Sequence, residues 1–256
     1  MAGETVLLQE LDGGVALVTL NRSEALNAMN RALNVDLLAR FQEIETMRSV
    51  RAVVLTGSGR AFSAGRDLKE YAATPPSPVA DWQQRTRSAF FSAVTGCGVP
   101  VIAAVNGYCL AGGCELALAC DLRVAGEGAV FGLPEIDHGI WPGAGATYRL
   151  PTLVGMGLAM ELLLTGARID ARRAAQIGLV NRVVADDQVV AEALTLARVI
   201  ASKSATAVRL MRAAVRLGRS LDEQSAVVAT GALRALVETT EERRAGPRAF
   251  AERHGG

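Results

Sequence analysis

The chain has 256 residues and a formal net charge of +1, and hydrophobic residues make up 50% of it. This content supplies a sizeable core and argues against disorder, while the near-neutral balance lacks the basic surplus of nucleic-acid-binding proteins. The length fits one large domain, or one domain with an appendage. Because glycine, asparagine or charge interrupts every long apolar stretch, no membrane span is predicted.

The first half of the chain alternates short apolar strands with helical periodicity. Two apolar runs, 5–11 and 15–20, flank Asp12-Gly13-Gly14 and predict a β-hairpin. Apolar residues then recur every three or four positions from Leu26 to Met47, which predicts a helix. Buried strands are expected at 51–57, 100–107 and 121–126, with a helix at 113–120. Strands that alternate with helices indicate an α/β fold with crossovers.

Helical periodicity dominates after about residue 145. Helices are expected at 158–164, 171–177, 189–200, 205–217 and 221–238, and the only strand-like run is 179–184. The apolar faces of these helices need a partner, either the core or another subunit. Arg209, Arg212, Arg216 and Arg219 recur at spacings of three and four, and we interpret them as a solvated helix face. Upstream, the proline-rich residues 74–78 are expected to form an exposed, mobile loop.

The cysteines do not have the spacing of a metal site. Cys97, Cys109, Cys114 and Cys120 include no CxxC pair, and only two histidines occur, so no metal site is predicted. Buried free thiols are expected at Cys109, Cys114 and Cys120, which lie in a small, apolar stretch, and this agrees with a reducing compartment. The N-terminus lacks a basic region followed by an apolar run, so no secretory signal is predicted and a cytoplasmic location is expected.

Gly112 and Gly113 stand between a predicted strand and a predicted helix. The first N–H groups of a helix have no intrahelical partner, and glycine allows close approach of a ligand. An N–H here can therefore hold a carbonyl oxygen that gains negative charge. The simpler interpretation is tight strand–helix packing. Glu115 falls in the first helical turn, where the helix dipole favours a carboxylate. Its neighbours are apolar, and burial of an unpaired carboxylate is costly, so a position facing a cleft is favoured.

Two further segments carry polar groups that suit such a cleft. Glu135 follows Pro134 without regular periodicity, so a surface charge is its simpler interpretation. Paired with Glu115 in a dry site, however, it can divide acid and base roles. Such a pair also suits glycoside hydrolysis, but aromatic residues make up only 4% of the chain. In residues 61–70, the Arg66 N–H is a second candidate oxyanion donor, and Asp67 is alternatively a helix cap.

Several segments resemble the crotonase, or enoyl-CoA hydratase/isomerase, superfamily. They are AFSAGRDLKE (61–70), PVIAAVNGYCLAGGCELALACD (100–121), FGLPEIDHGIWPGAG (131–145) and LTGARIDARRAAQIGLVNRVV (164–184). The resemblance covers most of residues 5–200 and implies a spiral of ββα units followed by a helical trimerisation region. We therefore expect a core with the active site over 1–195 and a helical oligomerisation region over 196–256. A homotrimer or a hexamer, a dimer of trimers, is implied.

The resemblance also implies a reaction and a role for each site residue. Water adds across the C2–C3 double bond of a trans-2-enoyl-CoA thioester through an oxyanion-stabilised enolate, in fatty acid metabolism. The backbone N–H groups of Arg66 and Gly112 match the family's oxyanion hole. Glu115 would activate water for attack at C3, and Glu135 would deliver a proton to C2. The implied partner is the acyl-CoA substrate, and neither a metal nor a cofactor is implied, because coenzyme A is part of that substrate.

The implied coenzyme A contacts come from two parts of the chain. They are Ala64, Arg66, Asp67, Leu68, Lys69 and Gly112, with Arg253 in the C-terminal tail near the CoA phosphates. Arg66 stands where many family members have alanine, so its guanidinium is either a contact for CoA phosphates or a solvated group. Tyr71 and Trp141 are candidates for the acyl pocket, although Trp141 equally suits a core, and His138 is interpreted as structural. The acyl chain length is left open.

Two alternatives remain at this point. One is a Δ3,Δ2-enoyl-CoA isomerase or another crotonase-type reaction that uses the same enolate. The other is a binding or scaffolding member of the family without activity. Retention of both Glu115 and Glu135 favours hydration, since isomerisation can proceed with one carboxylate.

Overall fold

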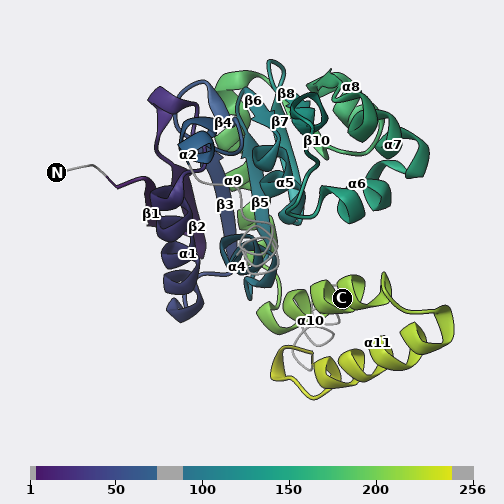
Figure 1. Cartoon of the computed structure of the whole chain (residues 1–256). Helices are drawn as coiled ribbons and strands as arrows, with labels where there is room; N and C mark the ends of the chain where they lie inside the picture. Colours follow the sequence, from purple (N-terminus) through teal and green to yellow (C-terminus); the bar gives the residue numbers. More distant parts are fainter. Residues whose placement is uncertain (1–3, 74–88, 244–256) are drawn as a thin grey trace.

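The computed structural model describes residues 4–73 and 89–243 (Figure 1). A six-stranded sheet has the order β1-β2-β3-β5-β7-β10. A four-stranded sheet has the order β4 (Ala61–Ser63), β6 (Tyr108–Leu110), β8 (Val130–Gly132) and β9 (Arg168–Asp170). The strands of the larger sheet are β1 (Val6–Leu11), β2 (Val15–Leu20), β3 (Ala52–Gly57), β5 (Val101–Val105), β7 (Leu122–Gly126) and β10 (Arg182–Val184). Only the β1–β2 pair of this sheet is antiparallel. The predicted α/β fold is confirmed.

The larger sheet is covered on both faces, as its continuous apolar strands require. Alternate residues of β3 enter two different hydrophobic clusters, since successive side chains of a strand point to opposite faces. Val53 and Leu55 pack with the apolar stripe of α1 (Arg31–Thr46), whereas Val54 packs with α9 (Val189–Ala201). The two helices lie on opposite faces of the sheet and fix its place in the core.

The first helix begins later than the apolar periodicity predicts. Asn30 caps α1 by accepting a hydrogen bond from the Leu33 N–H at 2.9 Å. Leu26 and Asn27 instead have φ of +52° and +53°, in the left-handed region, which no helix continues through. The Asn27 side chain donates to the carbonyls of Ser58 and Ala61. These hydrogen bonds attach the segment before α1 to the turn between β3 and β4. The prediction that the helix begins at Leu26 is therefore wrong.

The second half is helical, but it also contributes to the smaller sheet. Its helices are α6 (Ala146–Val154), α7 (Met156–Thr165), α8 (Ala171–Gln176), α9, α10 (Ala205–Gly218) and α11 (Glu223–Glu238). Five of these match the predicted spans, whereas α6, which contains Pro151, was not predicted. The prediction of a single strand-like run is also wrong, because β9 (Arg168–Asp170) pairs with β8. The proline-rich residues 74–78 lie outside the described residues.

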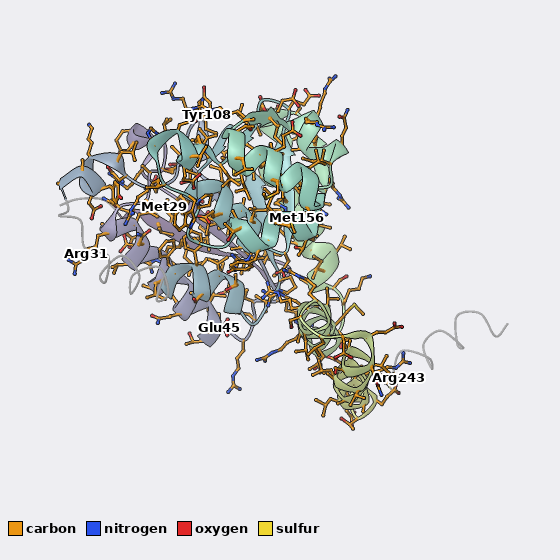
Figure 2. The ribbon with its side chains drawn as sticks, turned by 45° about the vertical axis from the view of Figure 1, so that its right-hand side comes forward. Met29, Arg31, Glu45, Tyr108, Met156 and Arg243 are labelled. Carbon is orange, nitrogen blue, oxygen red and sulfur yellow. The ribbon has the colours of Figure 1, made fainter. Side chains whose placement is uncertain are left out.

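The last two helices form an arm apart from the sheets (Figure 1). None of the described residues of α10 and α11 is buried within the single chain. Figure 2 labels Arg243 on this arm and Met156 on the core. All four cysteines are buried and free, as predicted for Cys109, Cys114 and Cys120. Among the described residues, no helix is long and apolar enough to cross a membrane.

Candidate active site

The smaller sheet brings the sequence-predicted residues to one edge. Its strands are β4 (Ala61–Ser63), β6 (Tyr108–Leu110), β8 (Val130–Gly132) and β9. Because β4, β6 and β8 run parallel, the segments that follow them emerge at the same edge. These segments carry Arg66, Gly112 and Glu135, which line a cavity of about 300 Å³ together with Glu115.

Gly112 lies at an unusual turn into α5 (Gly112–Ala119). The preceding Ala111 has φ +48° and ψ −126°, a conformation that costs about 1–3 kcal/mol for a residue with a side chain. Two hydrogen bonds hold it there: the Ala111 N–H donates to the Gly132 carbonyl at 2.9 Å, and its carbonyl accepts from the Glu115 N–H at 3.0 Å. Within the described part of the chain, no acceptor is found for the Gly112 N–H. Gly112 itself lines the cavity.

The backbone of Arg66 is oriented by a bridge to Met29. The Met29 N–H donates to the Gly65 carbonyl at 2.7 Å, and the Asp67 N–H donates to the Met29 carbonyl at 3.1 Å. In this parallel arrangement the N–H of Arg66 itself points away from Met29. A Cβ built on Gly112 would lie 3.8 Å from the Arg66 nitrogen. The two proposed donors are therefore neighbours across a small space.

Gly112 and Gly113, at the start of α5, are glycines for different structural reasons. A Cβ on Gly113 would lie 2.2 Å from the Ser63 carbonyl oxygen, so this position requires glycine for packing against β4. A Cβ on Gly112 would meet nothing closer than 3.7 Å. The packing interpretation holds for Gly113, whereas the absence of a side chain at Gly112 leaves room for a ligand.

Glu115 is a buried and oriented carboxylate. It is 3% exposed, and its Oε1 accepts hydrogen bonds from the N–H groups of Ala144 at 2.7 Å and Ala146 at 3.1 Å. These charge-assisted bonds offset part of the cost of burying the group. They also fix the direction in which the carboxylate faces the cavity that it lines. The predicted position facing a cleft is confirmed.

Glu135 is buried as well. It lies in the 3₁₀ helix η2 (Pro134–His138), which follows β8 directly, and it is 8% exposed. Its simpler interpretation as a surface charge is wrong, because the turn after β8 directs it inward instead of into solvent. The structure thus places both glutamates around one cavity.

Asp67 takes the capping role. Its carboxylate accepts hydrogen bonds from the N–H groups of Lys69 at 3.1 Å and Glu70 at 3.4 Å, at the start of α2 (Leu68–Ala73), and pairs with Arg22 at 3.2 Å. Partial burial raises the pKa of Asp67, but these hydrogen bonds outweigh it and the net pKa is lowered. Neither Asp67 nor the exposed Lys69 is among the described residues that line the cavity.

Several side chains complete the cavity wall. Ala64, Leu68 and Tyr71 line it, and the Arg66 guanidinium lies 4.3 Å from the centroid of the Tyr71 ring. This cation–π contact argues against a freely solvated Arg66 side chain. Trp141 also lines the cavity but is 72% exposed, so its interpretation as a core residue is wrong. Arg253 lies outside the described residues.

Sequence reasoning missed part of the wall. The lining also includes Phe90 and Phe91 of α4 (Ala89–Gly96), Ile140, His138 and Arg168. The adjacent rings of Phe90 and Phe91 have centroids 4.4 Å apart. Their aromatic pair was the available signal, but it falls outside the glycine-marked motifs. Within the described residues, no group of three or more His, Cys, Asp and Glu side chains could hold a metal ion.

Comparison with known proteins identifies the family. The sequence model of the enoyl-CoA hydratase/isomerase family matches residues 10–255. The chain belongs to this family. It is 41% identical over 239 residues to 2,3-dehydroadipyl-CoA hydratase of Escherichia coli, with 93% of this chain and 92% of the relative covered. It is 37% identical over 257 residues to the short-chain-enoyl-CoA hydratase of Clostridium acetobutylicum, with 96% and 95% covered.

Solved structures agree with the family. The crystal structure of an enoyl-CoA hydratase from Bacillus anthracis superposes with a TM-score of 0.92 at 38% identity and covers 97% of this chain and 96% of that one. The enoyl-CoA hydratase of Mycobacterium tuberculosis H37Rv gives a TM-score of 0.89 at 34% identity, with 98% and 97% covered. The predictions of a crotonase fold, of this family and of an enzyme are confirmed.

Proposed function

We propose that this chain is an enoyl-CoA hydratase that adds water across the C2–C3 double bond of a trans-2-enoyl-CoA. The supporting observation is the cavity that two buried glutamates share with the Arg66 and Gly112 backbones. Addition of a nucleophile at C3 moves negative charge onto the thioester oxygen. Two preorganised N–H donors stabilise that charge, and each is worth about 2.7–4 kcal/mol of the barrier.

The two glutamates take different tasks. Glu115, whose Oε1 is held by Ala144 and Ala146, activates water for attack at C3. Glu135 delivers the proton to C2. Gly112 and Glu115 share the first turn of α5, so the carboxylate lies close to the proposed site of the thioester oxygen. The hydrogen bonds to Oε1 then fix the orientation of the carboxylate there. Proton transfer between positioned groups then needs no cofactor, and coenzyme A enters only as part of the substrate.

The proposal extends to the binding of coenzyme A and to assembly. Ala64, Leu68 and Tyr71 meet the substrate in the cavity wall, and the guanidinium of Arg66 attracts CoA phosphates. Asp67, Lys69 and Arg253 act at the outer part of the CoA, and Trp141 bounds the acyl pocket. We further propose a core over 1–195, an oligomerisation region over 196–256, a homotrimer or hexamer, and a cytoplasmic location. The exposed apolar side chains of the arm, Met211, Val215, Val227 and Val228, support assembly.

The acyl group is to be found by assay. The relatives' names point to different substrates, a dehydroadipyl-CoA and short-chain enoyl-CoAs. Loss of enoyl absorbance is therefore measured with trans-2-enoyl-CoAs of short, long, aromatic and dicarboxylic acyl groups. Turnover of at least one is expected. A folded protein that binds CoA esters but turns over none of them would instead be a binding member of the family.

Glu115→Gln and Glu135→Gln test the assigned roles. Each variant is expected to lower kcat by at least about 100-fold, because a positioned acid or base contributes about 10²–10⁴-fold. Glu127→Gln is the matched control, since Glu127 is exposed after β7 and does not line the cavity. Near-wild-type activity of either cavity variant would remove its proton-transfer role. An isomerase would convert a trans-3-enoyl-CoA faster than it hydrates a trans-2-enoyl-CoA.

A further inference from the structure

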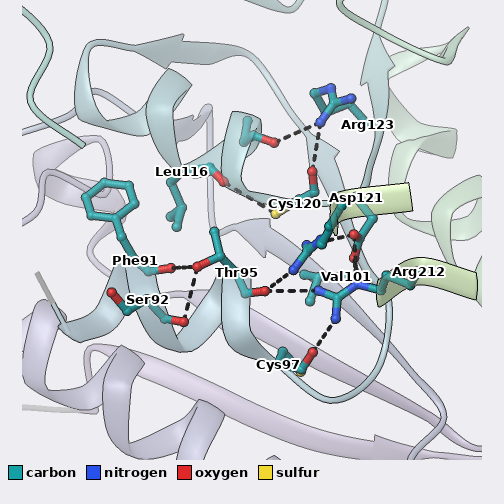
Figure 3. Close-up of polar contacts among 12 residues, drawn as sticks. Phe91, Ser92, Thr95, Cys97, Val101, Leu116, Cys120, Asp121, Arg123 and Arg212 are labelled. Atoms are coloured by element: carbon teal, nitrogen blue, oxygen red, sulfur yellow. Dashed lines mark hydrogen bonds and ion pairs between the residues drawn. The ribbon is translucent and has the colours of Figure 1, made fainter. Parts of the chain in front are cut away.

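Two helices that wall the cavity converge at their far ends. α4 contributes Phe90 and Phe91 to the cavity, and α5 contributes Gly112 and Glu115. Beyond the end of α5, Asp121 begins the turn into β7. The carboxyl-terminal carbonyls of α4 lie beside this turn, where one arginine side chain reaches both (Figure 3).

That arginine is Arg212 of α10. Its Nε lies 2.8 Å from both carboxylate oxygens of Asp121, and its other nitrogens donate to the carbonyls of Cys97 and of Thr95, the latter at 3.3 Å. Arg216, one turn further along α10, donates to the Thr95 carbonyl and pairs with Asp121 at 2.8 Å. The solvated-face interpretation is therefore wrong for Arg212 and Arg216. We refer to Arg212, Arg216, Asp121, Thr95 and Cys97 as the clamp.

The clamp is connected to the cavity wall by hydrogen bonds. The Thr95 hydroxyl donates to the carbonyl of Phe91 at 3.0 Å, and the Thr95 carbonyl accepts from Arg212 (Figure 3). Asp121 also accepts a hydrogen bond from the Val101 N–H at 2.9 Å, which fixes the start of β5. Hydrogen bonds thus run from the arm to the last turn of α4 and on to the backbone carbonyl of Phe91, a residue that lines the cavity.

The short length of α4 makes it depend on these contacts. An eight-residue helix is marginal alone, and the carbonyls of its last turn need donors. Positive guanidinium groups at that end also suit the helix dipole. The side chains of Arg212 and Asp121 are only 14% and 18% exposed, so water and salt screen their pairing less than that of a surface pair. The arm supplies such donors to the carbonyls of Thr95 and Cys97.

We propose that Arg212 is a positioning residue for the acyl pocket, and that the arm thereby sets which acyl chains the pocket accepts. Arg212 holds the end of α4 against the end of α5, and this fixes Phe90 and Phe91 relative to Glu115. Without the clamp, α4 moves outward and the pocket widens toward longer acyl chains. This inference rests on the proposed function, because it assigns the selectivity of the same cavity.

The test compares two substrates in Arg212→Met. The ratio of kcat/KM for a ten-carbon to a four-carbon trans-2-enoyl-CoA is expected to rise at least about tenfold, mainly through KM, since each methylene in an apolar pocket contributes measurably. Arg212→Lys retains the cation and is expected to restore part of the wild-type ratio. Arg209→Met, on the same helix and exposed, is the matched control and should leave the ratio unchanged.

Other outcomes decide against the proposal. An equal fall of kcat/KM for both substrates, together with a lower Tm, would show a structural role alone. An unchanged ratio of kcat/KM for the two substrates would also show that Arg212 does not position the acyl pocket. If Arg212→Met fails to fold, Thr95→Val removes the hydroxyl that bonds the carbonyls of Phe91 and Ser92 and should shift the ratio in the same direction. If the wild-type protein hydrates nothing, the proposed function fails, but the inference is still tested by the dissociation constants of butyryl-CoA and decanoyl-CoA.

Discussion

A single methyl group at Gly65 is expected to separate the two proposed oxyanion donors. Gly65 is buried beside the start of α5 and has φ +88°. A Cβ built on it would lie 2.8 Å from the Leu110 carbonyl oxygen and 2.9 Å from the Gly112 nitrogen. These neighbours are backbone atoms that cannot swing aside like a flexible side chain. In Gly65→Ala the loop after β4 must therefore move away from Gly112.

Two costs follow, and different measurements report them. The positive φ costs a residue with a side chain about 1–3 kcal/mol of stability. Displacement of one donor from the thioester oxygen costs up to about 2.7–4 kcal/mol of the barrier, the range for loss of one oxyanion-hole donor, or about 10²–10³-fold in kcat. Gly65→Ala should accordingly lower the free energy of unfolding by about 1–3 kcal/mol and kcat by about 100-fold.

Gly155→Ala separates the two costs. Gly155 has a similar φ of +83° at the junction of α6 and α7, and apart from its chain neighbours no heavy atom of the described residues lies within 4 Å of a Cβ built there. It should lose comparable stability in thermal or denaturant unfolding and keep its kcat within about threefold, because only strain is introduced. The reasoning is refuted if Gly65→Ala retains near-wild-type kcat, or if both variants lose activity equally.

Two predictions concern charged groups that hold the site's supporting elements. The net pKa of Asp67 is lowered in the folded protein. Its ionised carboxylate therefore stabilises the fold fully at pH values above the unfolded pKa of about 3.9. This stabilisation is lost as the pH falls through the lower folded pKa. The stability difference between wild type and Asp67→Asn should therefore shrink between pH 5 and pH 2, roughly the span around these values, and a constant difference would contradict it. Buried Arg123 donates to the carbonyls of Ala117, Cys120 and Leu179. Arg123→Met should lower the free energy of unfolding by at least about 2 kcal/mol in denaturant unfolding, whereas exposed Arg172→Met should change it by under about 0.5 kcal/mol. Equal losses would refute the role of Arg123 as a cap for the end of α5.

The central strands β3 and β5 of the larger sheet were predictable, because burial on both faces leaves a continuous apolar run in the sequence. The strands that build the active site were harder to predict. β4, β6, β8 and β9 have three residues each, too few for any periodicity to appear. The glycine-marked turns that follow three of them were recognised, but the sheet that aligns those turns was not.

Burial of a charged residue was predictable only where its neighbours in the sequence are apolar. Glu115 lies in an apolar helix, so the cost of burial correctly favoured a position facing a cleft. Glu135 lies in a short 3₁₀ turn, whose neighbours carry no such pattern. Arg212 follows a spacing that solvated and docked helices share. Its partner Asp121 is 91 residues away in the sequence, and only the folded chain brings the two together.

These observations converge on α5, which is held at both ends. At its start, the strained turn at Ala111 is fixed by hydrogen bonds to Gly132 and Glu115, as such strain requires. At its end, Arg123 caps the last carbonyls, and Asp121 joins the clamp. A donor pair works only if its geometry holds to within about 0.5 Å. The arginines at the far end of α5 therefore belong to the same support as the proposed Gly112 donor, although they do not line the cavity.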